Sequence, residues 1–277
     1  MLDRLEALLD HFPISARLLD AGPLGQAALP VAASQQPVLH LINGPASLRL
    51  ATGQVLAIDQ PSVLLLAQAQ AHALDAVQGA AATRVSARLQ FEAGQGSPLA
   101  EALPEPILLP VSGLYGCEAI LPLLLEEALS QRCGRQALLD RLFELVIIQL
   151  LRTLMENGQI QVGLLAGMRH PRLRHALVAM HEAPAQDWSL QALAEHAGMS
   201  RSAFAESFRT VIGSTPGHYL QAWRTRLVQQ ALRRGLPLKR IASEVGYGSE
   251  AALSRVFKAQ TGQSPRQWKQ ALTNPND

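Results

Sequence analysis

The chain has 277 residues, of which 48% are hydrophobic and 17% are charged, so it is long enough to bury two separate cores. Its two cysteines cannot build a disulfide framework or a thiol zinc site, and no apolar run reaches the roughly 18 residues that span a bilayer. The net charge of +2 is unevenly distributed: residues 1–168 hold 9 Lys/Arg against 15 Asp/Glu, whereas residues 169–277 hold 15 against 7. We therefore expect the basic C-terminal part to meet nucleic-acid phosphates.

The first twelve residues mix leucines with Asp3, Glu6 and Asp10, which predicts an amphipathic helix rather than a signal peptide. We therefore expect a cytoplasmic protein. Residues 13–112 are rich in glycine, proline and short apolar runs, a pattern that predicts an antiparallel β-sandwich or β-barrel. The expected strands are residues 38–42, 46–51, 54–59, 62–67, 71–77 and 85–91.

Residues 94–110 contain four prolines and are expected to form an irregular surface connection, after which helices are predicted over 118–131 and 135–157. The second helix is apolar on more than one face, which is more than a single packed neighbour can bury. Either it lies between two domains of one chain, or it pairs two subunits. The second alternative assigns dimerisation to Leu139, Leu142, Val146 and Leu150.

The cysteines lie in or beside these helices. Cys117 and Cys133 are expected to be reduced thiols, with redox sensing as the alternative.

The C-terminal part contains an internal repeat. Residues 193–200 read Leu-Ala-Glu-His-Ala-Gly-Met-Ser, and residues 241–248 read Ile-Ala-Ser-Glu-Val-Gly-Tyr-Gly. Each copy has a short apolar helix, a glycine turn, a serine and a longer helix ending in Phe-Arg or Phe-Lys, which is the form of a helix-turn-helix. Two copies in register indicate a DNA-binding domain. The match continues at an offset of 49, where Phe204, Phe208, Arg209, Gly213, Pro216 and Tyr219 correspond to Leu253, Phe257, Lys258, Gly262, Pro265 and Trp268.

A long helix is expected between the two copies. Thr215 and Pro216 form a cap followed by a proline at the first helical position, and the helix should end near Gly235. Its roughly 19 residues span about 28 Å. That length is close to the approximately 34 Å between successive major-groove faces of a duplex, so one chain can present both recognition helices to the same side of DNA.

Base contacts are expected from the exposed N-terminal faces of the two recognition helices, whose apolar pairs face the core. The residues expected to contact bases are Arg201, Ser202, Ala205, Glu206, Glu250, Ala251, Ser254 and Arg255, and Arg255 is the strongest of these candidates. The residues expected to contact phosphates are Ser200, Arg209, Lys239, Arg240, Ser249 and Lys258. At any single base position a phosphate or water contact is the alternative, because half or more of protein–DNA hydrogen bonds go to the backbone. Arg224 can instead serve helix packing or an ion pair.

Tandem helix-turn-helices joined by a long helix, behind a strand-rich domain, resemble the AraC/XylS family of bacterial transcription regulators. The resemblance implies binding to double-stranded DNA, a small-molecule effector and activation through contact with RNA polymerase. Where Glu206 stands, members of the family often carry an arginine that reads guanine; the acid here can accept from a cytosine amino group. The residues that carry the resemblance are 199–204, 216–220, Trp223, Arg224, 241–242, 245–252, Phe257, Lys258, Gly262 and Pro265.

The N-terminal part resembles the cupin-like sensory domain of one AraC subgroup, at residues 39–42, Gly53, 62–66 and His72. This resemblance assigns His40 and His72 to an effector pocket. A metal-binding cupin needs a further histidine and a carboxylate near the first histidine, where this chain has Leu41 and Ile42. We therefore expect no metal and no cofactor.

The expected fold is an α+β multidomain protein: a cupin-like β-barrel or sandwich, a helical linker or dimerisation region, and an all-α domain with two helix-turn-helix motifs joined by a long helix. The expected domains are residues 1–112 for sensing, 113–168 for the linker and dimerisation helices, and 169–277 for DNA binding. The expected function is a sequence-specific, homodimeric transcription regulator. A metal-dependent cupin enzyme fused to a DNA-binding domain and an architectural DNA binder are the alternatives.

Overall fold

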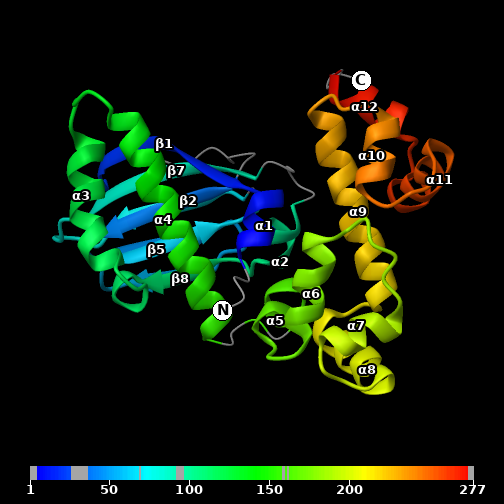
Figure 1. The fold of residues 1–277 in the computed structure, drawn as a ribbon. Coiled ribbons are helices and arrows are strands. Elements are labelled where there is room, and N and C mark those ends of the chain that lie inside the picture. The colour runs from blue at the N-terminus through cyan, green and yellow to red at the C-terminus, as the bar shows by residue number, and fades with distance from the viewer. Residues whose placement is uncertain are drawn as a thin grey trace. The chain divides into compact units, whose positions relative to one another are not determined.

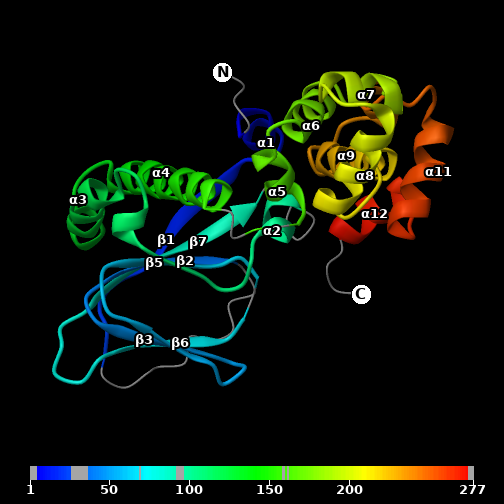
Figure 2. The ribbon, with the colours of Figure 1, turned by 90° about the horizontal axis from the view of Figure 1, so that it is seen from below.

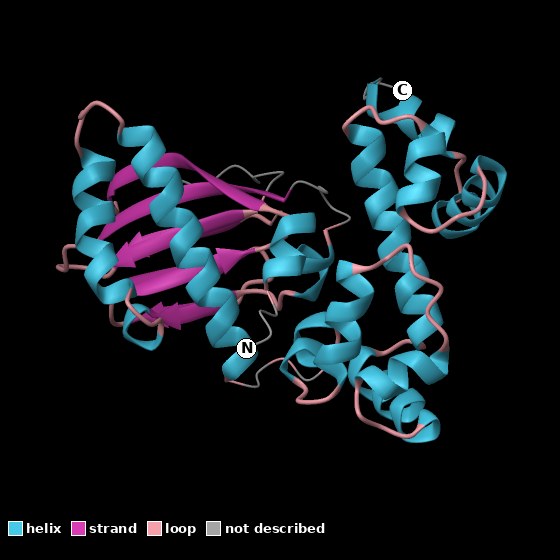
Figure 3. Ribbon diagram, viewed as in Figure 1, coloured by secondary structure: helices cyan, strands magenta, loops and turns pink. Residues whose placement is uncertain are grey.

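The computed structural model of the chain describes residues 5–25, 37–68, 70–91, 97–157, 160 and 162–273. They form two compact units, drawn together in Figure 1. The sandwich unit consists of Ile14–Phe91 and Leu99–Asn157. The helical unit consists of Met1–Pro13, Glu92–Pro98 and Gly158–Asp277. All strands of the described residues belong to the sandwich unit (Figure 3).

The sandwich unit contains two antiparallel sheets, which lie one above the other in Figure 2. The larger sheet has the strand order β1-β7-β2-β5-β8 and the smaller has the order β4-β3-β6. The strands are β1 (Ile14–Pro23), β2 (Val38–Asn43), β3 (Ala46–Leu50), β4 (Val55–Ile58), β5 (Ser62–Leu66), β6 (His72–Ala76), β7 (Thr83–Phe91) and β8 (Ile107–Pro110).

The larger sheet is covered on both faces, which explains why all five residues of β5 are buried. Leu64 and Leu66 belong to the core cluster that both sheets share, together with Leu48 of β3 and Leu74 of β6. Side chains alternate between the faces of a strand, so Val63 and Leu65 point to the opposite face. There the helices α3 (Cys117–Leu129) and α4 (Arg135–Glu156) lie across the sheet (Figure 2).

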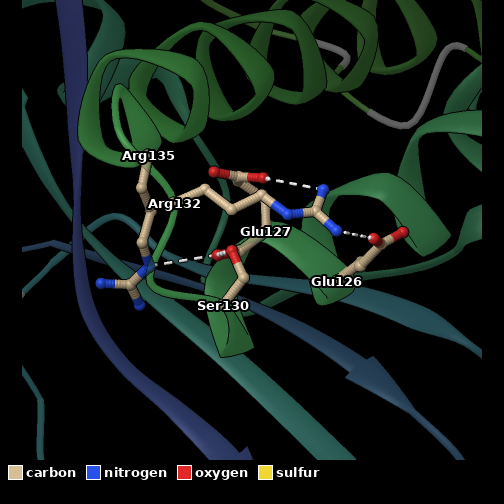
Figure 4. Close-up of polar contacts among 5 residues, drawn as sticks. All are labelled: Glu126, Glu127, Ser130, Arg132 and Arg135. Carbon is tan, nitrogen blue, oxygen red and sulfur yellow. Dashed lines mark hydrogen bonds and ion pairs between the residues drawn. The ribbon is translucent and has the colours of Figure 1, made fainter.

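The turn between α3 and α4 is fixed by an arginine cluster (Figure 4). Arg135 Nε donates to the Glu127 carbonyl at 3.1 Å, and Ser130 Oγ donates to the same oxygen at 3.1 Å. Arg132 forms an ion pair with Glu126 at 2.6 Å. Ser130 and Arg135 satisfy a carbonyl that the end of α3 leaves without a helical partner, and these contacts stabilise the turn between the two helices.

The structure corrects the residues assigned to dimerisation. Leu139, Val146 and Leu150 have no exposed surface and Leu142 is 8% exposed, because α4 packs on β1 and α3 within the same chain. The wide apolar surface of this helix therefore serves the sandwich unit's own core. The large apolar side chains that α3 and α4 do expose are Leu123, Leu129, Leu138 and Leu145.

The six predicted strands are present, with ends that differ by at most one residue, except that β7 begins two residues earlier than predicted. β1 and β8 were not predicted, and neither was the helix α2 (Pro98–Ala102); β8 and α2 lie in the segment expected to be irregular. β8 is only four residues long and ends at Pro110. β1 alternates buried and exposed residues only at its beginning, so its sequence lacks a clear period of two.

The helical unit contains α1 and eight C-terminal helices among the described residues. The helix α9 runs between the pairs α7–α8 and α10–α11 (Figure 1), as the repeat predicted. The helices are α1 (Glu6–His11), α5 (Leu164–Arg169), α6 (Leu173–Glu182), α7 (Leu190–His196), α8 (Arg201–Ile212), α9 (Pro216–Arg233), α10 (Leu238–Glu244), α11 (Glu250–Thr261) and α12 (Pro265–Thr273).

Local signals define the ends of these helices. Thr215 Oγ1 accepts from the backbone N–H of His218, which caps α9 directly before the predicted proline. Gly213 ends α8 and Gly262 ends α11, each in the left-handed conformation that glycine adopts without strain. The predicted N-terminal helix is present as α1, and residues 1–4 lie outside the described residues.

The N-terminal helix packs in the helical unit, although the sequence-based division placed it in the sensing domain. Phe12 is 1% exposed and meets the Trp223 ring edge-on at 4.9 Å. His11 Nε2 lies 3.1 Å from the His181 carbonyl, and Gln230 donates to the His11 carbonyl. Residues 1–13 are thus part of the C-terminal packing unit, whereas the functional boundaries at residues 112 and 168 stay predictions.

No helix of the described residues has both the length and the apolar composition needed to cross a membrane.

Replacing Phe12 by alanine should lower the free energy of unfolding of the helical unit by about 3–5 kcal/mol, because it leaves a cavity against Trp223. Phe12→Leu, which keeps most of the volume, should cost less than about 1.5 kcal/mol. Urea unfolding followed by tryptophan fluorescence is a suitable measurement, since all three tryptophans lie in the helical unit. An unchanged transition in Phe12→Ala would contradict the docking of α1.

Candidate nucleic-acid interface and histidine relay

The two recognition helices, α8 and α11, bury equivalent sides. Phe204 and Phe208 of α8 have no exposed surface, and neither does Leu253 of α11, while Phe257 is 1% exposed. Because one side of each helix faces the core, the residues on its other side face solvent. Of the residues predicted to contact bases, Arg201, Ser202, Glu206, Glu250, Ala251 and Arg255 are exposed, and Ala205 and Ser254 are half-buried.

Both recognition helices begin at a serine cap. Ser200 Oγ accepts from the backbone N–H of Ala203 at 3.4 Å, and Ser249 Oγ accepts from that of Ala252 at 3.2 Å. Each hydroxyl can still donate its own hydrogen to a phosphate oxygen. The first turns of the helices also carry partial positive charge, so their beginnings favour anions.

Four basic residues expected at phosphates are exposed around these helices: Arg209, Lys239, Arg240 and Lys258. Arg240 forms an ion pair with Glu244 at 2.7 Å, one helical turn along α10. Such an exposed pair contributes about 0–1 kcal/mol, so a phosphate can compete for the guanidinium. Arg209 and Lys258 lie in the last turns of α8 and α11, and Lys239 and Arg240 lie in α10, so these four cations are not at the beginnings of the recognition helices.

His40 and His72, predicted to line an effector pocket, lie side by side inside the sandwich unit. His40 is 1% exposed and His72 is 5% exposed, and their Nε2 atoms are 2.9 Å apart. His40 Nδ1 lies 2.8 Å from Ser86 Oγ, and His72 Nδ1 lies 3.2 Å from the Gln70 carbonyl. Four groups on three strands and a loop thus form one hydrogen-bonded chain, which we call the histidine relay.

The acceptor at one end of the relay fixes its tautomers. The Gln70 carbonyl can only accept, so His72 Nδ1 donates to it and His72 Nε2 is left as an acceptor. His40 Nε2 then donates to His72 Nε2, and His40 Nδ1 accepts from Ser86 Oγ. Both imidazoles are neutral in this arrangement.

Burial keeps the relay neutral. Desolvation lowers the pKa of His40 well below its usual value, and the neighbouring His72 and Arg84 lower it further. Desolvation also lowers the pKa of His72, although the Gln70 carbonyl opposes the shift. A proton added to His72 Nε2 would point at the N–H of His40.

In the relay the two Nε2 atoms share one hydrogen bond. Among the described residues no group of three or more histidine, cysteine, aspartate or glutamate side chains is placed to hold a metal ion.

The two cysteines have different surroundings. Cys117 is buried and desolvation raises the pKa of its thiol, which lowers its thiolate fraction, whereas Cys133 is exposed.

Two family models match the chain. The model described as a cupin matches residues 3–156, and the model described as a helix-turn-helix domain matches residues 193–271. The first covers more than half of the 277 residues and contains the sandwich unit with its relay. The second contains both recognition helices.

Similar proteins are named as transcription regulators of the helix-turn-helix type. AlkR of Acinetobacter baylyi, an HTH-type transcriptional regulator, is 34% identical over 188 residues, 66% of this chain and 61% of AlkR. The chain thus spans less than two thirds of that relative. RclR of Escherichia coli, an RCS-specific HTH-type transcriptional activator, is 30% identical over 252 residues, 88% of each chain. The crystal structure of ToxT from Vibrio cholerae has a TM-score of 0.40 at 13% identity, covering 93% of this chain and 94% of ToxT.

The relay makes stability depend on pH. Because burial lowers the pKa of His40 and His72 on folding, the unfolded chain binds more protons below its histidine pKa of about 6.5, and folding stability falls as the pH falls from there. We expect roughly 1–2 kcal/mol to be lost between pH 7 and pH 5. The double variant His40→Leu/His72→Leu should lack this loss. Burial also lowers the pKa of His181, to about 3, and this contribution to the pH dependence is the same in both chains. The difference between their urea-unfolding curves therefore isolates the relay; equal pH dependence would contradict it.

Proposed function

The chain belongs to the AraC-like transcription regulators, and from this membership we propose that it binds specific DNA sequences through its two recognition helices and senses a small molecule through its cupin-like domain. The observation that supports this proposal most is the equivalence of α8 and α11. Each is capped by a serine and begins with exposed polar residues, and α9 connects the two helix-turn-helix motifs to which they belong. The 18 residues of α9 span about 27 Å, which suits neighbouring major-groove faces.

In this proposal each recognition helix enters the major groove with its first two turns. Arg201, Ser202, Ala205 and Glu206 meet the bases of one half-site. Glu250, Ala251, Ser254 and Arg255 meet those of the other. Arg255 is the side chain best suited to a bidentate contact with guanine, and Glu206 to accepting from cytosine. The phosphate contacts come from Ser200, Arg209, Lys239, Arg240, Ser249 and Lys258.

The proposed sensor is the interior of the sandwich unit around the histidine relay. An apolar core with a few convergent polar groups is typical of small-molecule sites, and His40, His72 and Ser86 supply those groups here. A ligand that can accept from or donate to an imidazole would replace one of the relay's hydrogen bonds. If it prefers one arrangement of the domain, it shifts the population of chains able to bind DNA.

We further propose that the protein acts as an activator in the cytoplasm, as a homodimer that contacts RNA polymerase. RclR is named as an activator, and binding to chromosomal DNA requires a cytoplasmic location. The dimer is supported by Leu123, Leu129, Leu138 and Leu145, which α3 and α4 expose together.

Binding to the upstream region of the protein's own gene tests the function. In a fluorescence-anisotropy titration at physiological salt, we expect this duplex to bind at least about 10³-fold more tightly than a random duplex of equal length. A ratio near one would favour the architectural DNA binder, which has no sequence preference. Thermal-shift screening with small metabolites and oxidants tests the sensor separately.

Replacing Arg255 by alanine should weaken binding to the preferred duplex by about 1–3 kcal/mol and relax the preference at one base pair. The reason is the loss of one base-edge contact, while phosphate contacts remain. Lys239→Ala is the matched control: it should weaken all sequences alike and reduce the slope of log affinity against log salt by about 1. Titrations against single-base variants of the preferred duplex measure both effects. Arg255→Ala with unchanged strength and preference would refute this role.

A further inference from the structure

The loop that leads into the first helix-turn-helix is held by an arginine from the middle of α9. Arg224 Nε donates to the Pro184 carbonyl at 2.7 Å, and its terminal Nη2 donates to the Gln186 carbonyl at 2.8 Å. Two donors of one guanidinium thus hold two carbonyls of a single loop, a geometry that lysine cannot reproduce.

The same loop belongs firmly to the first helix-turn-helix. Trp188 Nε1 donates to the Ala183 carbonyl at 3.0 Å, which closes the loop on itself. The Trp188 ring meets His196, at the end of α7, edge-on at 5.0 Å. Ser189 then caps α7 by accepting from the backbone N–H of Ala192. Any movement of α7 therefore moves this loop.

The other side of the loop contacts the turn of the second helix-turn-helix. A Cβ placed on Gly246 would lie 2.4 Å from the Ala185 carbonyl oxygen and 2.8 Å from the Ala185 Cα, so the two backbones touch. Gly246 also has φ +81°, which favours glycine. Next to it, the Tyr247 ring lies 5.8 Å from the guanidinium carbon of Arg224.

Arg224 is therefore the meeting point of three elements: the middle of α9, the loop of the first helix-turn-helix and the turn of the second. We call the two helix-turn-helix parts, α7–α8 and α10–α12, the two heads. Each head packs on its own part of α9: Phe208 of the first meets Tyr219 edge-on at 5.7 Å, and the Trp268 ring of the second lies 5.1 Å from the guanidinium carbon of Arg233. These contacts join each head to α9. The loop contact joins the two heads directly, and so resists a rotation of one head relative to the other.

We propose that Arg224 is a positioning residue that locks the two helix-turn-helix heads in one relative orientation, and thereby sets the half-site spacing that the protein accepts. This inference rests on the proposed DNA-binding function. A chain with both heads locked binds the second half-site as an intramolecular step at high effective concentration, and freedom of rotation lowers that concentration.

The test uses the full-length chain, the duplex with both half-sites, each half-site alone, and duplexes with one or two base pairs inserted between the half-sites. Arg224→Met should weaken binding to the complete duplex about 10-fold or more, leave single half-sites within about twofold, and reduce the penalty for insertions. Arg224→Lys keeps the positive charge but cannot donate to both the Pro184 and the Gln186 carbonyl. Its affinity for the complete duplex should lie between those of the unsubstituted chain and of Arg224→Met. Gly246→Ala, which forces the two backbones apart, should behave like Arg224→Met.

Arg233→Met is the matched control. Arg233 lies on the same helix with its guanidinium carbon 5.1 Å from the Trp268 ring, so this variant loses an equal charge and a similar ring contact away from the loop. It should leave the spacing preference unchanged. An equal loss on all duplexes in Arg224→Met, or an unchanged spacing preference, would overturn the proposal.

A second measurement needs no DNA and separates this inference from the proposed function. Spin labels at Thr210→Cys and Gln260→Cys, on the exposed ends of α8 and α11, are introduced in a Cys133→Ser chain. The distribution of distances between the two spin labels should be narrow when residue 224 is arginine, including in the Arg233→Met control. It should be broad in Arg224→Met. If the chain prefers no duplex but the distribution broadens in Arg224→Met, the proposed DNA-binding function is contradicted and the positioning role of Arg224 is supported. A narrow distribution in Arg224→Met contradicts the positioning role, whatever the result with DNA.

Discussion

A stacked pair of rings, Trp223 on His181, fixes the helix on which the rest of the helical unit is built. The ring centroids are 3.7 Å apart at 16°, and both residues are fully buried. Burial lowers the pKa of His181 to about 3, so the imidazole is neutral at physiological pH and packs as an uncharged ring. Phe12 closes another side of Trp223. The helix α9 is therefore held at its middle by α6 and α1, and each of its two ends carries one helix-turn-helix head.

The tandem helix-turn-helix could be predicted because its signals are local. Ser200 and Ser249 stand directly before the helices that they cap, and Gly213 and Gly262 end them. The core pairs are four residues apart, which places both members on one helix face. The central strands could be predicted for a similar reason, since turn residues separate short apolar runs. These features need no knowledge of a distant partner.

The remaining features depend on partners far away in the chain. His11 forms hydrogen bonds with His181 and Gln230, which lie 170 and 219 positions further along the chain. No pattern within residues 1–13 shows that α1 packs against these residues. The apolar stripe with Leu139 and Val146 predicts that α4 is covered, but not that β1 of the same chain covers it. Likewise the sequence singled out His40 and His72, whereas Ser86, the third side chain of the relay, carried no signal of its own. Periodicity predicts that a surface is buried; only the fold determines its neighbour.

The charged residues of the helical unit occupy different positions on the recognition helices according to their sign and place along the helix. The basic excess of residues 169–277 is not concentrated at the beginnings of the recognition helices, where Glu206 and Glu250 are exposed beside Arg201 and Arg255. An acid at a helix beginning repels phosphates but discriminates among bases, because it can accept only from an amino group. On the proposed function, the exposed cations Arg209, Lys239 and Lys258 supply attraction to phosphates that does not depend on sequence. On the proposed function, affinity and specificity therefore reside on different side chains of each head. The relative orientation of the heads, which we propose that Arg224 sets, is then a third determinant, because it decides whether both recognition helices can enter their grooves on one duplex.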